Sequence, residues 1–470
     1  MSGTSHQPGA PVSLDAAVRL AGARAAETLM GGAGVTAGSP RLARVQLPVT
    51  EVAPLDWLRA QGHLTQYYWA DREGEFEMAG VGEADVAAPD CVDRDDGDVF
   101  AHMRARLAPD ARSQRYCGGF RFHPGPARSA RWRAFGDFRF VVPRFEVLRR
   151  GDHFDFACNV LVGDPASNRR TLASVAEMLD SLRSPHCAGQ LPLPPVATRA
   201  DAPDRGQWES LVGEALRTFR PGALEKVVLA RETVFAAAGT LDAVDLLTRL
   251  VEHTEQSFDF CFHPAPDRAF IGASPERLYK RTQCFLESEA VAGTRPRGRT
   301  DAEDAALGEA LLTDEKSRRE HAYVVNMLRE TLTRHCRHLS IEASPSLLRL
   351  RNVQHLKVRV EGLLAGPEDD MALIRALHPT PAVGGAPRAA ALKWLEEHEP
   401  FDRGIYASPV GWVSADGAEF CVAIRSGLVL GDTLALYNGA GIVAGSDPAE
   451  EWAELEYKMD NFLRVLFEYV

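Results

Sequence analysis

One residue that could perform chemistry is a lysine inside an apolar strand pattern. Lys226 opens the run KVVLAR, in which side chains alternate between two faces, so the amine shares a face with Val228 and Ala230. One interpretation is an edge strand whose lysine stem covers apolar surface while the ammonium reaches water, and this stretch alone favours it. The other is a partly desolvated amine that stays neutral and can accept a proton.

Two glutamates occupy positions where a carboxylate could take part in acid–base or metal chemistry. Glu276 follows the strand-like run FIGASP at a turn, where functional side chains concentrate, although a salt bridge with Arg277 would explain it as well. Glu320 stands one four-residue step before Val324 on the helix predicted from Thr313, so it continues an apolar stripe. A carboxylate entering a core needs a cation, a metal or a proton, whereas one at a helix end needs only a neighbouring arginine.

The predicted last helix carries two carboxylates and an amine along one edge. Glu451, Glu454 and Lys458 follow i, i+3, i+7 spacing beside its apolar stripe. A solvated row of salt bridges would show the same spacing and would contribute little stability. If the row faces a cleft instead, it suits a hard cation such as Mg²⁺ together with an anionic substrate group.

Two glycine-containing turns would let a ligand approach the backbone closely. Gly293 and Thr294 follow the apolar run EAVA, while Gly439 and Gly441 lie between the strand pattern that contains Arg425 and the last helix. A plain turn is the alternative interpretation at the first place. The chain contains neither a Walker-type phosphate loop nor a dinucleotide-binding fingerprint, so nucleotide chemistry has little support.

The composition limits the class of protein that these residues belong to. Of the 470 residues, 45% are hydrophobic and 25% are charged, as in soluble globular proteins, and no apolar run approaches a membrane span. A formal net charge of −12 argues against a nucleic-acid partner. Eight single cysteines without any Cys-x-x-Cys pair, and a start without a cationic and apolar leader, predict a cytoplasmic protein with reduced thiols.

The elements that must position these residues divide into two parts around a proline-rich segment. Residues 1–12 are expected to be disordered, and residues 13–200 include a predicted hairpin over 135–162 whose strands meet at RRGD. Four prolines in the fourteen residues from Leu191 predict an extended linker. Residues 205–470 contain nearly all of the candidate residues and form the predicted catalytic part.

Taken in order, the motifs resemble the chorismate-utilising enzymes, which include anthranilate synthase component I, aminodeoxychorismate synthase, salicylate synthase and isochorismate synthase. The resemblance runs from about Gln207 to the C-terminus and rests on KVVLAR, GASPERL, AGTRPRG, EKSRREH, HPTPAVGG, AIRSG, GAGIVAGSDP and EWAELEYK. Upstream, CGGFRFHP and FGDFRFVVPR resemble the amino-terminal part of the isochorismate synthase branch. The resemblance implies an α+β fold of large antiparallel β-sheets packed together, with helices outside and both halves in one compact unit.

Single positions indicate the branch of this family. Ala292 stands where aminodeoxychorismate synthases carry a lysine before Gly-Thr, and Lys226 is typical of the members that use water. HPTPAVGG from His378 is more similar to the isochorismate synthase form of its motif than to the salicylate synthase form. The resemblance thus implies an isochorismate synthase, which is an isomerase. A salicylate synthase is the alternative, and the presence of Lys226 and Glu276 disfavours a noncatalytic chorismate-binding subunit.

The same resemblance implies a role for each candidate residue. Lys226 takes a proton from the water that attacks C2 of chorismate, and Glu276 protonates the departing C4 hydroxyl. Mg²⁺ is expected at Glu320 and Glu454, with Glu451 a ligand directly or through water. The expected substrate contacts come from Gly293, Thr294, His378, Arg425, Gly439, Gly441 and Lys458. No obligatory protein partner is implied, and menaquinone and catechol siderophore synthesis both begin with this reaction.

Overall fold

Twenty strands form one hydrogen-bonded network in the computed structural model, which describes residues 10–31, 40–90, 99–107, 113–123, 129–185, 192–366 and 370–467. In chain order the strands are β1 (Arg41–Val49), β2 (Gln66–Ala70), β3 (Phe76–Ala87), β4 (Tyr116–Phe120), β5 (Phe138–Arg150), β6 (His153–Val162), β7 (Val196–Ala202), β8 (Lys226–Ala237), β9 (Phe258–Ala265), β10 (Arg268–Ser274), β11 (Arg277–Thr282), β12 (Phe285–Pro296), β13 (Cys336–Ile341), β14 (Ser346–Arg349), β15 (Val353–Leu364), β16 (Gly385–Ala386), β17 (Pro409–Val413), β18 (Gly417–Val422), β19 (Ser426–Leu430) and β20 (Thr433–Val443). The pairing between these strands is antiparallel throughout.

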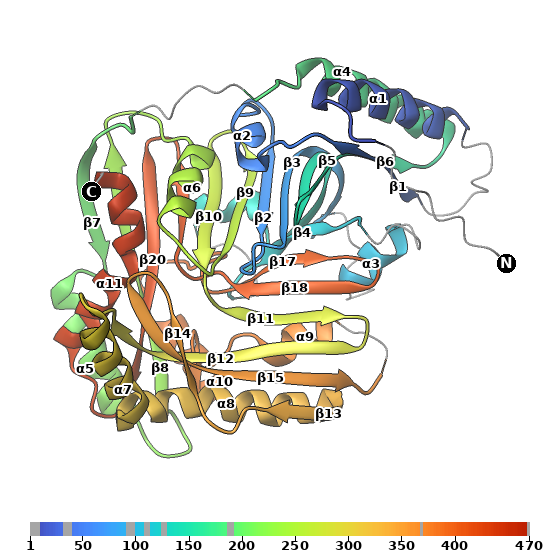
Figure 1. The fold of residues 1–470 in the computed structure, drawn as a ribbon. Helices are drawn as coiled ribbons and strands as arrows, with labels where there is room; N and C mark the ends of the chain where they lie inside the picture. Colours follow the sequence, from blue (N-terminus) through green and yellow to red (C-terminus); the bar gives the residue numbers. More distant parts are fainter. Residues whose placement is uncertain are drawn as a thin grey trace.

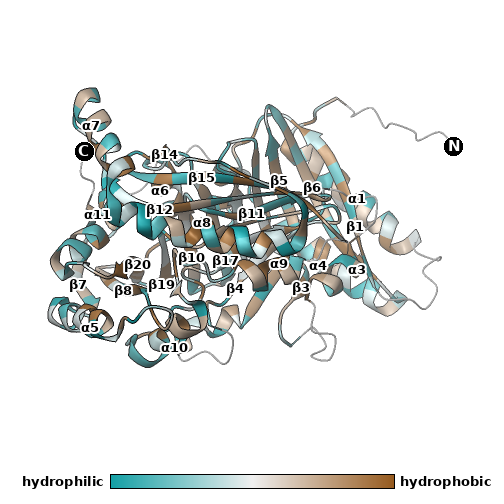
Figure 2. Ribbon diagram, turned by 90° about the horizontal axis from the view of Figure 1, so that it is seen from below, coloured by the Kyte–Doolittle hydropathy of each residue, from teal (hydrophilic) through white to brown (hydrophobic). Residues whose placement is uncertain are grey.

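Helices cover the outside of this network (Figure 1). They are α1 (Leu14–Gly31), α2 (Pro54–Arg59), α3 (Val99–Arg106), α4 (Pro165–Ser181), α5 (Arg205–Thr218), α6 (Ala243–Glu252), α7 (Asp301–Thr313), α8 (Glu315–His335), α9 (Asp370–Leu377), α10 (Arg388–His398) and α11 (Pro448–Phe467), with a 3₁₀ turn over Ala130–Phe135. Helix α8 lies along β12 and β15 (Figure 2), and α11 packs on β20. Helix α8 carries Glu320, and helix α11 carries Glu451 and Glu454.

The strand order places the N-terminal strands in the middle of the network. Starting at β7, the pairing runs through β8, β20, β19, β10, β9, β2 and β3 to β5. From β5 it continues through β4, β17, β18, β11 and β12 to β15. Strands of the predicted catalytic part therefore flank those of the N-terminal part on both sides. The predicted single compact unit is confirmed, and the proline-rich segment enters it as β7.

Aromatic side chains join the two parts of the sequence in one core. Phe100 of α3 and Phe140 of β5 contact Phe420 of β18, with ring centroids 6.0 and 6.2 Å apart. All three side chains are fully buried. Burying a phenylalanine contributes about 1.5–3 kcal/mol relative to leaving it in water. Neither part of the sequence can bury these rings without the other.

Several local predictions are confirmed. The turn at RRGD joins β5 to β6 as a hairpin. Helix α11 starts at Pro448, and the Asp447 carboxylate accepts hydrogen bonds from the backbone N–H groups of Ala449 and Glu450 at 2.9 and 3.0 Å. Most of the N-terminal stretch predicted to be disordered lies outside the described residues, although Val12 forms a bridge with Val49 of β1.

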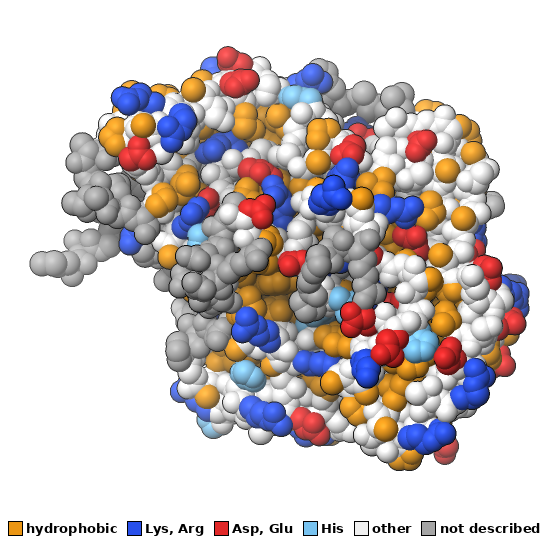
Figure 3. All heavy atoms as spheres, turned by 180° about the vertical axis from the view of Figure 1, so that it is seen from behind, with side chains coloured by type: hydrophobic (Ala, Val, Ile, Leu, Met, Phe, Trp, Pro, Cys, Tyr) orange, Lys and Arg blue, Asp and Glu red, His pale blue; other side chains and the backbone are white. Residues whose placement is uncertain are grey.

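The cysteines agree with the inference from composition. The six cysteines within the described ranges are free thiols. None of the helices in these ranges combines the length and the hydropathy needed to cross a bilayer. On the face shown in Figure 3, acidic and basic side chains are interspersed among the described residues.

A buried ionic cluster fixes α9 against the sheet. Asp370, the first residue of α9, is fully buried and accepts hydrogen bonds from Arg281 Nη2 at 2.8 Å and from the Tyr279 hydroxyl at 3.1 Å. Arg104 of α3 lies 3.2 Å from the same carboxylate. The cluster joins β11, α3 and α9, so it connects the two sequence parts by charge as well as by apolar packing.

We expect Asp370→Ala to destabilise the protein strongly, because it leaves the buried Arg281 guanidinium without its carboxylate. Breaking a buried pair in this way costs about 3–5 kcal/mol. Thermal unfolding followed by circular dichroism measures the effect. The control is Glu209→Ala, which removes an exposed pair with Arg205 and should leave the midpoint nearly unchanged. An unchanged midpoint for Asp370→Ala would show that the cluster contributes nothing to stability.

Candidate active site

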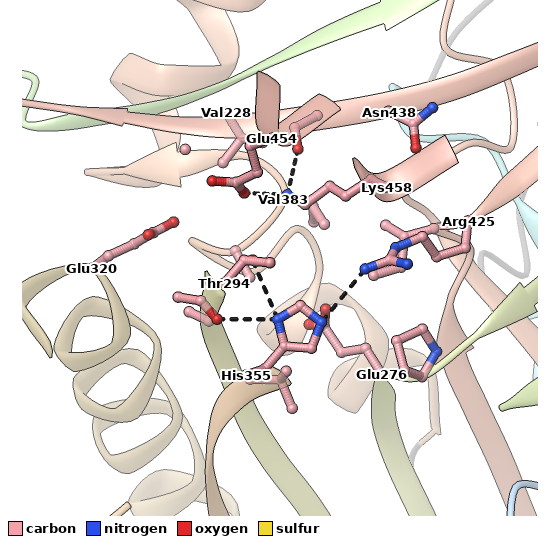
Figure 4. A pocket seen from close by; sticks show the side chains of 18 of the residues that line it. Val228, Glu276, Thr294, Glu320, His355, Val383, Arg425, Asn438, Glu454 and Lys458 are labelled. Carbon is pink, nitrogen blue, oxygen red and sulfur yellow. Dashed lines mark hydrogen bonds and ion pairs between the residues drawn. The ribbon is translucent and has the colours of Figure 1, made fainter. Parts of the chain in front are cut away.

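A cavity lies where β8, β12, β15 and β20 meet helices α8 and α11, and most of the predicted site residues line it (Figure 4). Those residues are Glu276, Gly293, Thr294, Glu320, Arg425, Gly439, Gly441, Glu454 and Lys458. They come from positions that the sequence separates by up to 182 residues (276 to 458), so the fold alone brings them together.

Lys226 is buried beside this cavity rather than on an edge strand. Its neighbours in the sheet are Val443 of β20 and Ala386 of β16, one on each side, and none of its side chain is exposed. The Nζ atom lies 3.1 Å from Glu320 Oε1, which belongs to a residue of the cavity wall. The edge-strand interpretation is therefore wrong, because both sides of β8 are paired at this point.

Gly441 makes this arrangement possible. A Cβ atom at position 441 would stand 2.3 Å from Glu320 Oε1 and 3.1 Å from Lys226 Cε. Separations as short as the first do not occur in proteins, so the end of the partly exposed Glu320 side chain would have to move away. Only a glycine leaves room for the amine and the carboxylate to meet at this wall.

Glu276 is a buried acid at the turn between β10 and β11, with only 4% of its surface exposed. Burial raises the pKa of Glu276 to about 8, and the charge of the nearby Glu289 carboxylate adds to this rise. The positive charges of Lys226 and Lys458 act in the opposite direction. At neutral pH the Glu276 carboxyl is therefore mainly protonated and can donate a proton.

His355 of β15 holds a second group of cavity residues together. Its Nδ1–H donates to the Gly293 carbonyl oxygen at 3.0 Å, and the Thr294 Oγ1 lies 3.2 Å from the same nitrogen. Burial, reinforced by the charge of Arg425, lowers the pKa of His355 to about 3, so the ring is neutral. Its other nitrogen, Nε2, then has a lone pair, which lies 3.5 Å from Arg425 Nη2 (Figure 4).

Arg425 provides a cation without a carboxylate partner among the described residues. Its guanidinium is buried, and this burial lowers the pKa of Arg425 to about 10. The backbone of Arg425 has φ +51°, a left-handed conformation that non-glycine residues adopt at a cost of about 1–3 kcal/mol and mainly at functional sites. A buried, unpaired cation held in a strained turn is suited to binding an anion.

Two carboxylates in the cavity form the candidate metal site. Glu320 comes from α8 and Glu454 from α11, and Figure 4 shows both pointing into the same space. Burial opposes ionisation of Glu454, but Lys458, 2.7 Å away, outweighs it and lowers the pKa of Glu454. No cluster of three or more potential ligands occurs in the described ranges. Two carboxylates nevertheless fit a hard cation such as Mg²⁺, which commonly takes its other ligands from water and substrate.

Besides Lys226, which lies beside the cavity, two predicted residues are not brought to its wall. His378 follows α9, and its ring packs edge-on against Phe122 with the ring centroids 5.5 Å apart. Two later residues of its motif, Ala382 and Val383, line the cavity instead. Glu451 is buried one turn before Glu454, and its Oε1 lies 2.7 Å from Lys316 Nζ. A motif can thus be correct while the side chain that reaches the cavity is another one.

Three polar side chains of the cavity wall were not identified from the sequence: His355, Tyr406 and Asn438. His355 lies in the strand-like run NVQHLKVRV, where nothing in the spacing separates it from a structural histidine. Its position opposite Thr294 depends on the register between β12 and β15, including an irregularity between Ala292 and Thr294. Only a cross-strand pairing could have identified it.

Comparison with known proteins gives a consistent result. Residues 28–467 match the family model described as "Chorismate binding enzyme". A salicylate biosynthesis isochorismate synthase from Pseudomonas aeruginosa is 36% identical over 440 residues, which cover 88% of this chain and 89% of that protein. An isochorismate synthase from Escherichia coli is 33% identical over 423 residues, which cover 88% of this chain and 90% of that protein.

Solved structures agree with the sequence matches. The menaquinone-specific isochorismate synthase from Escherichia coli superposes with a TM-score of 0.80 at 29% identity, over 94% of this chain and 99% of that one. Anthranilate synthase component I from Streptococcus pneumoniae superposes with a TM-score of 0.63 at 20% identity, over 92% and 94% of the two chains. The second match shows that the two proteins share the fold.

We expect Gly441→Ala to separate Lys226 from Glu320, because the added methyl group would occupy the place of the Glu320 carboxylate. A crystal structure of the variant should show this carboxylate displaced, with its oxygens well beyond the 3.1 Å that separates the pair in the wild type. Gly366→Ala is the control, since a Cβ atom there meets nothing within 4 Å. An unmoved Glu320 in the Gly441→Ala structure would contradict the steric argument.

Proposed function

We propose that this chain, which belongs to the chorismate-binding enzyme family, is an isochorismate synthase. The reaction is an isomerisation: water adds at C2 of chorismate, the two ring double bonds shift, and the C4 hydroxyl leaves. One proton is removed from the attacking water and one is supplied to the departing hydroxyl, so no redox cofactor is consumed. The observation that carries the proposal is a buried amine and a protonated carboxyl at the same cavity.

Lys226 is the proposed base and Glu276 the proposed acid. The charge of Lys226 acts on Glu276, and Glu276 faces the same cavity as Glu320, the partner of Lys226. In its neutral form Lys226 accepts the proton of the attacking water, and Glu276 transfers its own proton to the C4 hydroxyl, which leaves as water. Positioned proton transfer of this kind accelerates reactions by about 10²- to 10⁴-fold.

The charges of the cavity match the two carboxylates of chorismate. Arg425, which has no carboxylate partner among the described residues, binds the enolpyruvyl carboxylate together with Lys458. The Thr294 hydroxyl and the backbone at Gly293, Gly439 and Gly441 contact the substrate where side chains would block it. His378 is not proposed to contact the substrate, because its ring packs on Phe122 and does not line the cavity.

Glu320 and Glu454 would hold Mg²⁺, whose charge binds the ring carboxylate of chorismate. Both residues line the cavity, and Gly441 leaves space beside Glu320. Glu451 acts through water at most, since its carboxylate pairs with Lys316 outside the cavity wall. Both proposed ligands also pair with lysines, Glu320 with Lys226 and Glu454 with Lys458.

Product analysis of the purified protein with chorismate and Mg²⁺ tests the proposed function. We expect isochorismate, loss of its formation with a metal chelator, and recovery when Mg²⁺ is restored.

Lys226→Ala should reduce turnover by about 10²-fold or more while calorimetry still detects chorismate binding, because the base is removed and the groups that bind the carboxylates remain. Lys393→Ala, an exposed lysine on α10, is the control.

Other products would change the assignment. Salicylate and pyruvate would identify a salicylate synthase, and unchanged chorismate would identify a noncatalytic binding protein. A near-normal rate for Lys226→Ala would remove Lys226 from the mechanism.

The pH dependence should report the ionisation of Glu276. Because the protonated carboxyl is the active acid and its pKa lies at about 8, kcat/KM should fall as the pH rises through about 8. Glu276→Gln cannot donate a proton, so its rate should be lower by about 10²-fold or more. Steady-state kinetics over the neutral and alkaline range measure both effects. A wild-type profile that stays flat well above the Glu276 pKa would exclude Glu276 as the acid.

A further inference from the structure

A buried carboxylate that belongs to none of the predicted roles lies beneath the turn that carries Glu276. Glu289 of β12 has 6% of its surface exposed. Its Oε1 accepts a hydrogen bond from the backbone N–H of Arg277 at 2.9 Å, and its Oε2 lies 3.0 Å from Lys357 Nζ. Glu289 therefore binds the residue that immediately follows Glu276.

Arg72 holds the residue on the other side of Glu276. It lies in the turn between β2 and β3, in the N-terminal part of the sequence, and only 7% of its side chain is exposed. Its Nη1 donates to the Pro275 carbonyl oxygen at 2.7 Å, and its Nη1 and Nη2 both bind the Glu289 carboxylate. The pair of Arg72 and Glu289 thus holds the peptide units before and after Glu276.

The same carboxylate is a fixed negative charge near Glu276. Burial alone would raise the pKa of Glu289, but hydrogen bonding and charge from Arg72, with the charge of Lys357, outweigh it and lower that pKa. Glu289 therefore stays ionised and disfavours ionisation of Glu276. The other charged and titratable groups near Glu276 among the described residues are Lys226 of β8, Lys458 of α11, Tyr406 ahead of β17 and Cys421 of β18. Glu320, Glu454, Arg425 and the neutral His355 line the same cavity wall.

We propose that Glu289, held by Arg72 from the β2–β3 turn, is a positioning residue that fixes Glu276 in place and keeps it protonated for the reaction. The inference rests on the proposed function, in which Glu276 is the acid. It gives the N-terminal part of the sequence a direct share in the acid–base machinery. A purely structural ion cluster would stabilise the protein without setting the pH range of the reaction.

The test is the pH profile of Glu289→Gln. The amide oxygen can still accept the Arg277 N–H, so the turn is retained while the negative charge is removed and Arg72 and Lys357 lose the counter-charge of Glu289. Each of these changes favours ionisation of Glu276, so the alkaline fall in kcat/KM should move to lower pH by roughly one unit. Below that fall, the KM for chorismate should stay close to the wild-type value, since Glu289 does not line the cavity.

Glu287→Gln is the matched control. It makes the same chemical change on the same face of β12, two residues away, where Glu287 is only half-buried and has no ion pair among the described residues. Its pH profile should equal that of the wild type. Arg72→Met tests the contact on the other side of Glu276, because it removes the hydrogen bond to the Pro275 carbonyl oxygen. The value of kcat should fall by about tenfold with little change in KM, and Arg72→Lys should restore part of the rate.

Each outcome decides the inference. An alkaline fall in Glu289→Gln at the wild-type pH, in a protein that is folded and active, would overturn it and leave the proposed function intact. If the wild-type protein forms no isochorismate, the proposed function fails, and ¹³C NMR titration of the Glu276 carboxyl decides the local inference instead. The Glu276 signal, assigned by its absence in Glu276→Gln, should then titrate at lower pH in Glu289→Gln than in the wild type, and equal midpoints would refute it.

Discussion

The exclusion of water from the Glu276 carboxyl is the constraint on which the site depends. A buried carboxyl keeps its proton only while nearby cations do not draw it away. Lys226 and Lys458 both act on Glu276, and each is paired with a glutamate, at 3.1 and 2.7 Å. The two pairs limit the positive field at the acid, while Glu289 adds a negative one. An acid, two amines and three carboxylates thus coexist in one small region because their charges are balanced locally.

This balance links proton transfer to metal binding and to the rest of the fold. Glu320 and Glu454 are at once the lysine partners and the proposed ligands of Mg²⁺, so a change at either affects both functions. The space for the first pair depends on Gly441, and the turn that carries Glu276 depends on Arg72 from the other part of the sequence. The arginine proposed to receive the substrate, Arg425, depends on a strained backbone and on His355.

The sequence predicted the family, the fold class and most of the cavity, because those features reside in local motifs such as GASPERL, AGT and the spacing of the last helix. It did not predict burial of Lys226, since the strands that cover it, β16 and β20, lie far along the chain and the run KVVLAR is compatible with an edge. His355 went unidentified because its role arises from the register between β12 and β15, and Glu289 because its role arises from contacts with Arg277 and with Arg72 of the β2–β3 turn. His378 was expected at the cavity because the resemblance implies a substrate contact there, whereas the residues of its motif that line the cavity are Ala382 and Val383.

The position of the N-terminal strands within the network also governs how the chain must be made. A ribosome releases β1 to β6 first, yet β4 pairs with β17 and β2 with β9, and β8 is not covered until β20 emerges near the end of synthesis. The edges of these strands therefore stay unpaired while most of the polypeptide is still being translated. Strand pairs that are far apart in the sequence also form slowly during folding. Such a nascent chain is exposed to aggregation until these strands pair, and each half of the sequence leaves strand edges that only the other half covers.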